Sequence, residues 1–261
     1  MLKISIITVV RNDKRGLIKT EKSILSQSFK NFEWVVIDGN SSDGTKEYLT
    51  KLKYTFTNII SENDRGIYDA MNKGIRISEG DYLVFLNAGD EFFNSETLSV
   101  VYDKLASIEN VDVLFGGADI YFDNDNYIYR SPQDIDTCIN FSLPGHHQAT
   151  YYSKNILDKI EYPLEYEHSG DYAIICILYK NGIKTININE SLTKFVIGHH
   201  SFKNKYKILY YSSKVQKNIL QLSNLKISIS FIRRLFSTLI VQITYKYTFL
   251  TKVLNIILNK G

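Results

Sequence analysis

Four short polar segments contain the side chains of this sequence that are best suited to chemistry. Each directly follows an apolar run, and they cover residues 8–12, 38–45, 61–66 and 87–90. Carboxylates gathered in one place can bind a hard cation such as Mg²⁺, which proteins usually hold with one or two carboxylates plus phosphate oxygens of a substrate. Carboxylates also accept hydrogen bonds from the hydroxyls of a ribose. These segments therefore suggest a site for a phosphorylated, sugar-containing ligand.

The continuous apolar run at residues 3–10 predicts a strand that is covered on both faces. We expect further strands at residues 33–38, 57–61 and 81–86. Helices are expected between them at 15–27, at about 44–53 and from Ile67 onward. This alternating order predicts an α/β fold, a mostly parallel sheet with helices on both faces. Ligands of such sheets bind beyond the carboxyl ends of the strands, so the four polar segments should share one edge.

The second half of the sequence is more mixed. Residues 111–122 and 127–130 predict a hairpin, because a turn-forming segment separates two strand-like runs. A further strand is expected at 146–152 and a helix at 169–181. The two cysteines, Cys138 and Cys176, match no metal-binding spacing and are expected as idle thiols.

Charge divides the chain near residue 202. From there to the end lie nine lysines and two arginines with no acidic residue, so this segment has a charge of +11 and the rest has −8 of the net +3. We therefore expect a domain boundary there, with an acidic domain at 1–202 and a basic amphipathic helical tail at 203–261. The longest uncharged stretch of the tail, 235–245, is too short to span a bilayer.

Three interpretations of the tail differ in its partner. A basic amphipathic helix binds at an anionic membrane surface. Alternatively, the tail forms a helical pair that packs on the body, with its lysines in water. Binding of nucleic acid is not expected, because no known motif for it is present.

The sequence strings themselves resemble a known family. IITVVRN, VVIDGNSSDGT, SENDRGIYDAMNKGI and GDYLVFLNAGD are similar, in this order, to family 2 glycosyltransferases with the GT-A fold. The resemblance is nearly colinear over residues 3–93 and continues more weakly through HHQAT, SGDYAIICIL and GHHSF. It lies nearest to the branch that builds bacterial capsule, exopolysaccharide and lipopolysaccharide O-antigen, and it implies a Rossmann-like GT-A domain followed by C-terminal helices.

The resemblance also implies roles for individual residues. Asp171 would be the general base, and Asp90 would hold Mg²⁺ or Mn²⁺ against the diphosphate. His147 would lie near the acceptor, and one of His199 and His200 would touch the diphosphate or the metal. The remaining implied positions form the nucleotide-sugar site: Thr8, Val9, Arg11, Asp38, Asp64, Lys73, Asn87 and Ala88.

One feature departs from the family pattern, and two of the implied residue roles have a simpler structural explanation. The usual Asp-x-Asp metal motif reads Asn87-Ala88-Gly89-Asp90 here, so one carboxylate remains. Asp64 and Asp171 also stand where they can cap helices, since a short acceptor side chain there satisfies free N–H groups. Asp38 follows a strand and precedes a glycine, and has no such alternative.

We therefore expect an inverting, metal-assisted enzyme that transfers a sugar from a nucleoside-diphosphate sugar, UDP-linked, to a saccharide on a polyprenyl lipid carrier. It would be cytoplasmic and peripheral on the inner face of a bacterial membrane. The rival from another class is a non-catalytic nucleotide- or glycan-binding scaffold with a degenerate site. A dinucleotide oxidoreductase is excluded by the absence of G-x-G-x-x-G after the first strand.

Overall fold

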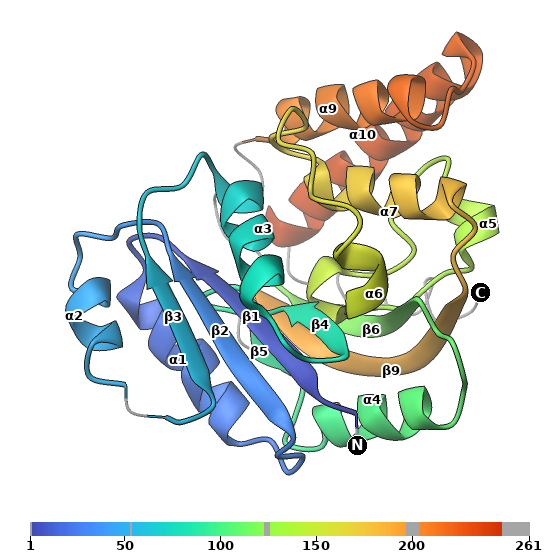
Figure 1. Ribbon diagram of the computed structural model, residues 1–261. Coiled ribbons are helices and arrows are strands. Elements are labelled where there is room, and N and C mark those ends of the chain that lie inside the picture. The colour runs from blue at the N-terminus through green and yellow to red at the C-terminus, as the bar shows by residue number, and fades with distance from the viewer. Residues whose placement is uncertain (1, 53, 123–125, 197–203, 247–261) are drawn as a thin grey trace.

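A computed structural model describes residues 2–52, 54–122, 126–196 and 204–246. Within these ranges, the chain folds as a nine-stranded sheet in the order β3-β2-β1-β4-β8-β6-β9-β5, with β7 paired to β6 (Figure 1). The first four strands in chain order are β1 (Ile4–Val10), β2 (Phe32–Asp38), β3 (Thr57–Ser61) and β4 (Tyr82–Phe85). They are mutually parallel, so their carboxyl ends share one edge, as expected.

The other half of the sheet is mixed. Its strands are β5 (Glu91–Phe92), β6 (Val113–Tyr121), β7 (Tyr127–Arg130), β8 (Thr150–Ser153) and β9 (Thr185–Val196). Strand β8 is antiparallel to both β4 and β6, whereas β6 and β9 are parallel. The predicted hairpin is confirmed, because β6 and β7 are adjacent and antiparallel.

Helices cover both faces of the sheet (Figure 1). They are α1 (Lys14–Leu25), α2 (Thr45–Leu49), α3 (Ile67–Ile77), α4 (Thr97–Ala106), α5 (Ile135–Cys138), the short 3₁₀ helix η1 (His147–Ala149), α6 (Lys154–Leu157), α7 (Gly170–Lys180), α9 (Lys205–Asn218) and α10 (Asn224–Lys246). The α/β fold predicted from the alternating pattern is thus confirmed.

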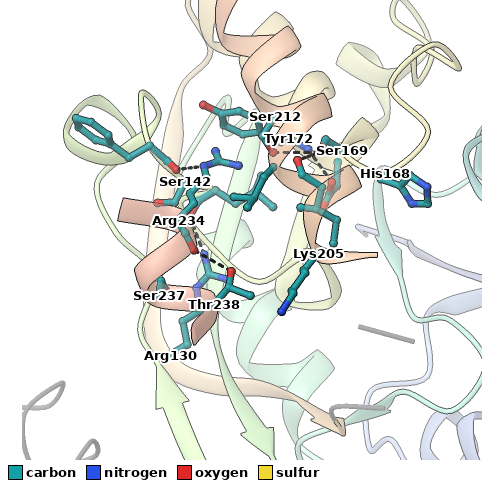
Figure 2. Close-up of a pocket in the computed structure, with 15 residues that line it drawn as sticks. Arg130, Ser142, His168, Ser169, Tyr172, Lys205, Ser212, Arg234, Ser237 and Thr238 are labelled. Carbon is teal, nitrogen blue, oxygen red and sulfur yellow. Dashed lines mark hydrogen bonds between the residues drawn. The ribbon is translucent and has the colours of Figure 1, made fainter. Parts of the chain in front are cut away.

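The two C-terminal helices pack on the body beside α7. Leu209 and Val215 of α9 are buried, and Val215 belongs to the core that includes α7. The hydroxyls of Ser169, before α7, and Ser212, on α9, lie 3.1 Å apart (Figure 2). Helix α10 packs mainly on α9. Among the described residues, no helix is long and apolar enough to cross a bilayer.

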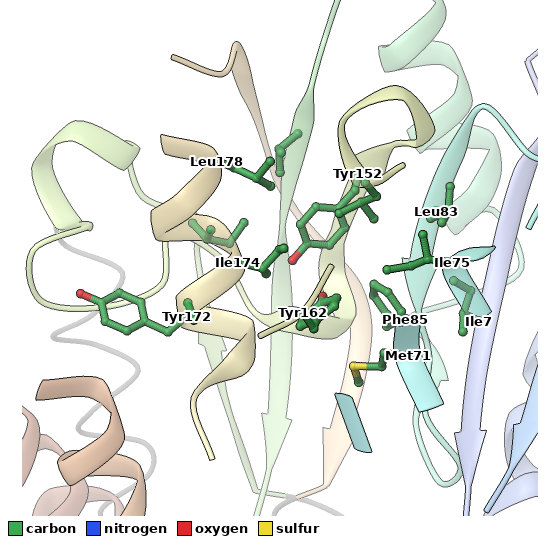
Figure 3. Close-up of a cluster of buried hydrophobic side chains, with 14 of the residues drawn as sticks. Ile7, Met71, Ile75, Leu83, Phe85, Tyr152, Tyr162, Tyr172, Ile174 and Leu178 are labelled. Carbon is green, nitrogen blue, oxygen red and sulfur yellow. The ribbon is translucent and has the colours of Figure 1, made fainter. Parts of the chain in front are cut away.

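Two cores lie on opposite faces of the sheet. On the face covered by α3 and α7, Phe85 and Tyr162 pack with Ile174 (Figure 3). On the face covered by α1 and α4, Trp34 is fully buried with its neighbours. Helix α3 approaches β1 closely, because a Cβ at Gly74 would lie 2.5 Å from Cγ2 of Ile7. This approach brings the start of α3 to the edge where the strands end.

Two sequence expectations need correction. The strand expected at 146–152 begins only at Thr150, because the Thr150 hydroxyl and the Ala149 N–H both donate to the His146 carbonyl and close a tight turn. The helix expected at 44–53 is the five-residue α2. Beyond Leu49 its backbone changes to tighter bonds three residues apart, such as Leu52 N–H to the Leu49 carbonyl.

Candidate active site

The ends of β1, β2 and β3 form the first part of the site. Val10, Asp38 and Ser61 stand side by side in the sheet register. The Asp38 carboxylate is fully buried and accepts hydrogen bonds from the Ser61 hydroxyl at 2.6 Å and the Ser41 N–H at 3.2 Å. Asp38 therefore ties together the loops after β2 and β3, and so fixes the shape of this edge.

Arg11 and Asp64 face each other across the same edge. Nη1 of Arg11 lies 4.0 Å from Oδ1 of Asp64, and the Arg11 side chain is largely exposed while that of Asp64 is buried. A Cβ at Gly39 would lie 2.3 Å from Oδ2 of Asp64, so this position requires glycine. Asp64 also accepts the N–H of Gly66 at 3.0 Å, and thus supports the turn before α3.

Lys73 lies behind this edge, on α3. Its Nζ is 2.8 Å from a carboxylate oxygen of Glu62 and donates to the Asn63 carbonyl at 2.7 Å. The lysine therefore holds the loop after β3 rather than standing free in water. A phosphate near this loop would compete with Glu62 for the same ammonium group.

Thr8 and Val9 contribute differently to the edge. The Thr8 hydroxyl donates to the Leu86 carbonyl at 2.8 Å and accepts the indole N–H of Trp34 at 2.9 Å, so it is used inside the core. The Val9 carbonyl accepts the N–H of Ala88 at 3.2 Å. This bond joins the end of β1 to residues 87–90 and links the two parts of the site.

Asp90 is buried beside Gln148. Its Oδ2 accepts a hydrogen bond from Nε2 of Gln148 at 2.9 Å. Burial raises the pKa of Asp90 to about 7, against the smaller opposing effect of this hydrogen bond. The nearby Oδ1 of Asn87 is buried without a hydrogen-bond partner in the described chain. The Asn87 oxygen is thus free to accept a hydrogen bond or to bind a cation.

A cavity of about 260 Å³ extends from Asn87 to Asp171. We call it the central cavity, and its walls are Ile67, Tyr68, Met71, Asn87, Arg130, Leu143, His146, His147, Gln148, Asp171 and Phe195. It brings together three residues that the sequence assigns to the site, Asn87, His147 and Asp171, from segments far apart in the chain. Arg11, Asp38 and Asp64 do not line it.

Asp171 lies in the first turn of α7. Its Oδ1 accepts the N–H of Tyr172 at 2.9 Å and the hydroxyl of Tyr68 at 3.4 Å. Burial and the charge of Asp171 raise the pKa of Tyr68 well above its ordinary value, so this hydroxyl keeps its proton. Both of these donors use Oδ1, so Oδ2 of Asp171 has no hydrogen-bond donor among the described residues.

The comparison with protein-family models decides the identity of this fold. The model of Glycosyl transferase family 2 matches residues 5–181, which include the carboxyl ends of β1 to β4 and Asp171. The chain belongs to glycosyltransferase family 2. The resemblance drawn from the four sequence strings is therefore confirmed.

Curated members of the family are similar over most of the chain. An uncharacterized glycosyltransferase of Mycobacterium tuberculosis is 32% identical over 175 residues, covering 66% of this chain and 67% of its own length. WfaP of Escherichia coli is 29% identical over 226 residues, covering 83% of this chain and 86% of its own length. WfaP is described as a UDP-Glc:α-D-GlcNAc-diphosphoundecaprenol β-1,3-glucosyltransferase.

Solved structures show the same GT-A fold. A segment of S. aureus TarS in complex with UDP-GlcNAc has a TM-score of 0.68 at 20% identity, covering 90% of this chain and 73% of that one. The mannosyltransferase PcManGT of Pyrobaculum calidifontis, in complex with GDP-Man and Mn²⁺, has a TM-score of 0.66 at 14% identity, covering 85% and 65%. The expected GT-A fold is confirmed.

The fold family raises the question of a metal ion. None of the described residues form a group of three or more His, Cys, Asp or Glu side chains that could hold one. Asp90 and the unpartnered Oδ1 of Asn87 nevertheless present two oxygen donors. This donor set fits Mg²⁺ or Mn²⁺ only if phosphate oxygens of a ligand complete the coordination.

Of the three histidines that the resemblance assigns to the site, the structure describes His147. His147 lines the central cavity, and both of its ring nitrogens are buried without a hydrogen-bond partner among the described residues. Its ring stacks on Phe85 with the ring centroids 5.3 Å apart. Burial lowers the pKa of His147, so the ring is neutral at physiological pH. His199 and His200 lie outside the described residues.

Sequence patterns did not identify several residues of this family 2 site. Tyr68 and Arg130 line the central cavity, and neither belongs to a recognisable catalytic pattern. Arg234 of α10 lies in a neighbouring pocket with Asp171. The one available signal for Arg234 was an arginine within an otherwise apolar helical run.

Proposed function

We propose that the chain is an inverting glycosyltransferase. Its donor is a nucleoside-diphosphate sugar that carries UDP, and its acceptor is a saccharide on a polyprenyl diphosphate carrier. One observation supports it above the others: the Asp171 carboxylate lines a cavity that reaches Asn87 and Gln148, the partner of Asp90. A potential base and the proposed donor-sugar end of the site thus share one enclosed space. The UDP-linked substrates printed for WfaP and TarS support the choice of nucleotide.

In this proposal the donor binds along the ends of the parallel strands. Arg11 and the backbone of Thr8 and Val9 border the base, and Asp38 and Asp64 face the base and ribose. Lys73, Asn87 and Ala88 border the diphosphate and the donor sugar. The hydrogen bond between Val9 and Ala88 keeps these two groups of residues at a fixed separation.

Asp171 acts as the general base. The acceptor hydroxyl gives its proton to the carboxylate while its oxygen forms a bond to the anomeric carbon of the donor sugar. The bond between that carbon and the diphosphate oxygen breaks at the same time, and its electron pair leaves with the nucleoside diphosphate. Attack and departure on opposite faces invert the anomeric configuration. Tyr68 positions the carboxylate through its 3.4 Å hydrogen bond.

Asp90 and Asn87 would hold a divalent cation, Mg²⁺ or Mn²⁺, together with the donor diphosphate. Such a cation, when bound, neutralises charge that develops on the leaving group. Asp90 must then be ionised, and its raised pKa makes that ionisation depend on pH near neutrality. Gln148 keeps the carboxylate oriented through the hydrogen bond to Oδ2. His147, neutral and buried, borders the acceptor sugar.

The C-terminal helices would bring the enzyme to its lipid-linked acceptor. Exposed apolar residues on α10 are spaced three, four or seven apart and share one face: Leu225, Ile229, Ile232, Phe236 and Ile243. Such a face, next to exposed Lys226 and Arg233, fits an anionic membrane surface. We therefore propose residues 1–202 as the catalytic domain and 203–261 as the membrane-binding element, on the inner face of a bacterial cell membrane. The product would be a repeat unit of a surface polysaccharide such as capsule or lipopolysaccharide.

Turnover of the Asp171→Asn variant tests this function. Release of UDP from a panel of UDP-sugars should be measured with membrane extracts that contain lipid-linked saccharides. We expect turnover to fall by about 10²–10⁴-fold, since the general base is lost, while UDP affinity stays unchanged. Asp158→Asn, at an exposed carboxylate, is the matched control. Equal turnover of the wild type and Asp171→Asn would contradict the role of Asp171 as the base. Turnover of the wild type no higher than background would favour the scaffold alternative, which the single carboxylate of the metal motif supports.

A further inference from the structure

A second pocket lies on the other side of Asp171. It occupies about 320 Å³ between the start of α7, the loop at 141–143 and the C-terminal helices α9 and α10. We call it the arginine pocket, after Arg130 and Arg234 in its wall (Figure 2). Arg130, Leu143 and Asp171 line this pocket and the central cavity alike. Asp171 therefore stands between the donor side of the site and a separate space.

The two arginines are held by the protein without a neutralising partner. Nε of Arg234 donates to the Phe141 carbonyl at 2.5 Å, and its guanidinium lies 4.5 Å from the centre of the Tyr172 ring. Nη2 of Arg234 is buried without a hydrogen-bond partner in the described chain. Nη2 of Arg130 donates to the Leu143 carbonyl at 2.9 Å. Neither guanidinium forms an ion pair with a described carboxylate.

Burial of two cations without an ion pair destabilises the folded protein unless an anion binds beside them. A buried guanidinium with an unused N–H loses hydration without a compensating bond. Burial lowers the pKa of both arginines, and the neighbouring groups that oppose this effect, Asp171 among them, do so only in part. Asp171 supplies one negative charge, whereas Lys205 adds a third positive one at the rim. The pocket therefore retains a positive balance that suits a ligand with more than one negative charge.

The remaining wall suits phosphate oxygens. Ser142 lies beside Arg234, and Ser169 and Ser212 contribute two further hydroxyls on the side of the pocket near His168 (Figure 2). Ser237 and Thr238 of α10 add two more from the opposite side. Planar guanidinium groups bind phosphate through paired hydrogen bonds, and hydroxyls complete the set of donors. A carboxylate ligand would use fewer of these donors than a diphosphate.

We propose that the arginine pocket binds the diphosphate group of the acceptor. This inference rests on the proposed function, in which the acceptor is a sugar on a prenyl diphosphate. With the diphosphate between Arg130 and Arg234, the attached sugar extends past Leu143 toward Asp171. The C-terminal helices thereby form one wall of the acceptor site.

Binding of inorganic pyrophosphate and of farnesyl diphosphate tests the proposal. Calorimetry is performed without metal and with saturating UDP, so that the donor site is filled. We expect both probes to bind, and Arg234→Gln and Arg130→Gln to weaken each by about tenfold or more, since a charge-assisted contact is lost. Arg76→Gln is the matched control, because Arg76 is an exposed arginine of α3 that pairs with Glu161 and lines neither pocket.

Several results would overturn the proposal. Probes that bind only when UDP is absent, or equally well to Arg234→Gln, would place the anion in the donor site. Loss of phosphatidylglycerol-vesicle binding by Arg234→Gln, as strong as its loss of farnesyl diphosphate, would assign the pocket to a phospholipid headgroup. If Arg234→Gln fails to fold, Arg234→Lys replaces it in the experiment. This variant keeps the charge but not the paired donors, so it should bind both probes with an affinity between those of the wild type and Arg130→Gln. If UDP does not bind, only the proposed function is contradicted. Binding of pyrophosphate to the arginine pocket can then still be measured, because no ligand fills the donor site.

Discussion

Asp90 accepts a hydrogen bond from Gln148 across 2.9 Å, and this contact joins the loop after β4 to the short helix η1 before β8. The two residues are 58 positions apart in the sequence. Their contact places the remaining carboxylate of the metal motif beside the central cavity. The carboxylate is also buried at this position, and burial raises the pKa of Asp90.

Asp90→Asn should stabilise the protein more at high pH than at low pH. Burial raises the pKa of Asp90 to about 7, whereas an unfolded Asp titrates at about 3.9, so the folded state binds the proton more tightly. Binding of this proton contributes fully to the free energy of unfolding below about pH 4, and the contribution is lost as the pH rises to about 7. The variant avoids this loss, and its gain approaches about 4 kcal/mol above pH 7.

Urea unfolding at pH 5 and pH 8, in EDTA, measures this effect. Asn keeps the shape of the side chain and can still accept from Gln148, so packing is preserved. Asp103→Asn, at an exposed carboxylate of α4, should change little at either pH. An Asp90→Asn gain that is the same at both pH values would contradict the raised pKa.

Tyr68→Phe should lower turnover without lowering donor affinity. The variant removes the hydroxyl that donates to Oδ1 of Asp171 and leaves the ring stacked on Tyr162, 5.5 Å away between centroids. Loss of one such bond predicts a fall in kcat of about 3–10-fold. Steady-state kinetics with UDP calorimetry separates the two quantities. Tyr210→Phe, at an exposed tyrosine, is the control, and a change in UDP affinity alone would contradict a positioning role.

The exposed apolar face of α10 should determine membrane binding. Ile232→Ser with Phe236→Ser removes two side chains that are 52% and 61% exposed, so the fold should be little affected. Each side chain contributes up to about 1.5–3 kcal/mol when it leaves water, so vesicle affinity should fall at least about tenfold. Co-sedimentation with phosphatidylglycerol vesicles measures this. Ile59→Ser, at an exposed residue of β3, should bind as the wild type does; equal sedimentation of all three proteins would exclude α10 as the contact.

The sequence predicted the parallel half of the fold well. Continuous apolar runs such as that of β1 have all residues buried, and a strand of this kind has few alternatives. The segment at 146–152 was harder, because a polar side chain, Thr150, competes for the His146 carbonyl and delays the strand. Local side-chain hydrogen bonds of this kind leave no periodic signal.

The candidate site was predictable only in part. Motif spacing indicated Asp90 and Asp171, but not that Gln148 would hold one and Tyr68 the other. Those contacts depend on long-range packing of β8 and α3. The arginine pocket needs α7 and α10 together, and their residues are separated by more than 50 positions. No local pattern reports such a contact.

Calorimetry of UDP, GDP and CDP binding, each with and without Mn²⁺, tests the central claim most directly. The account predicts that UDP binds most tightly, that Mn²⁺ strengthens binding to the wild type, and that Asp90→Asn loses the strengthening but keeps metal-free binding. Failure of all three nucleotides to bind, with or without Mn²⁺, would contradict a nucleotide-sugar site at the ends of β1 to β4.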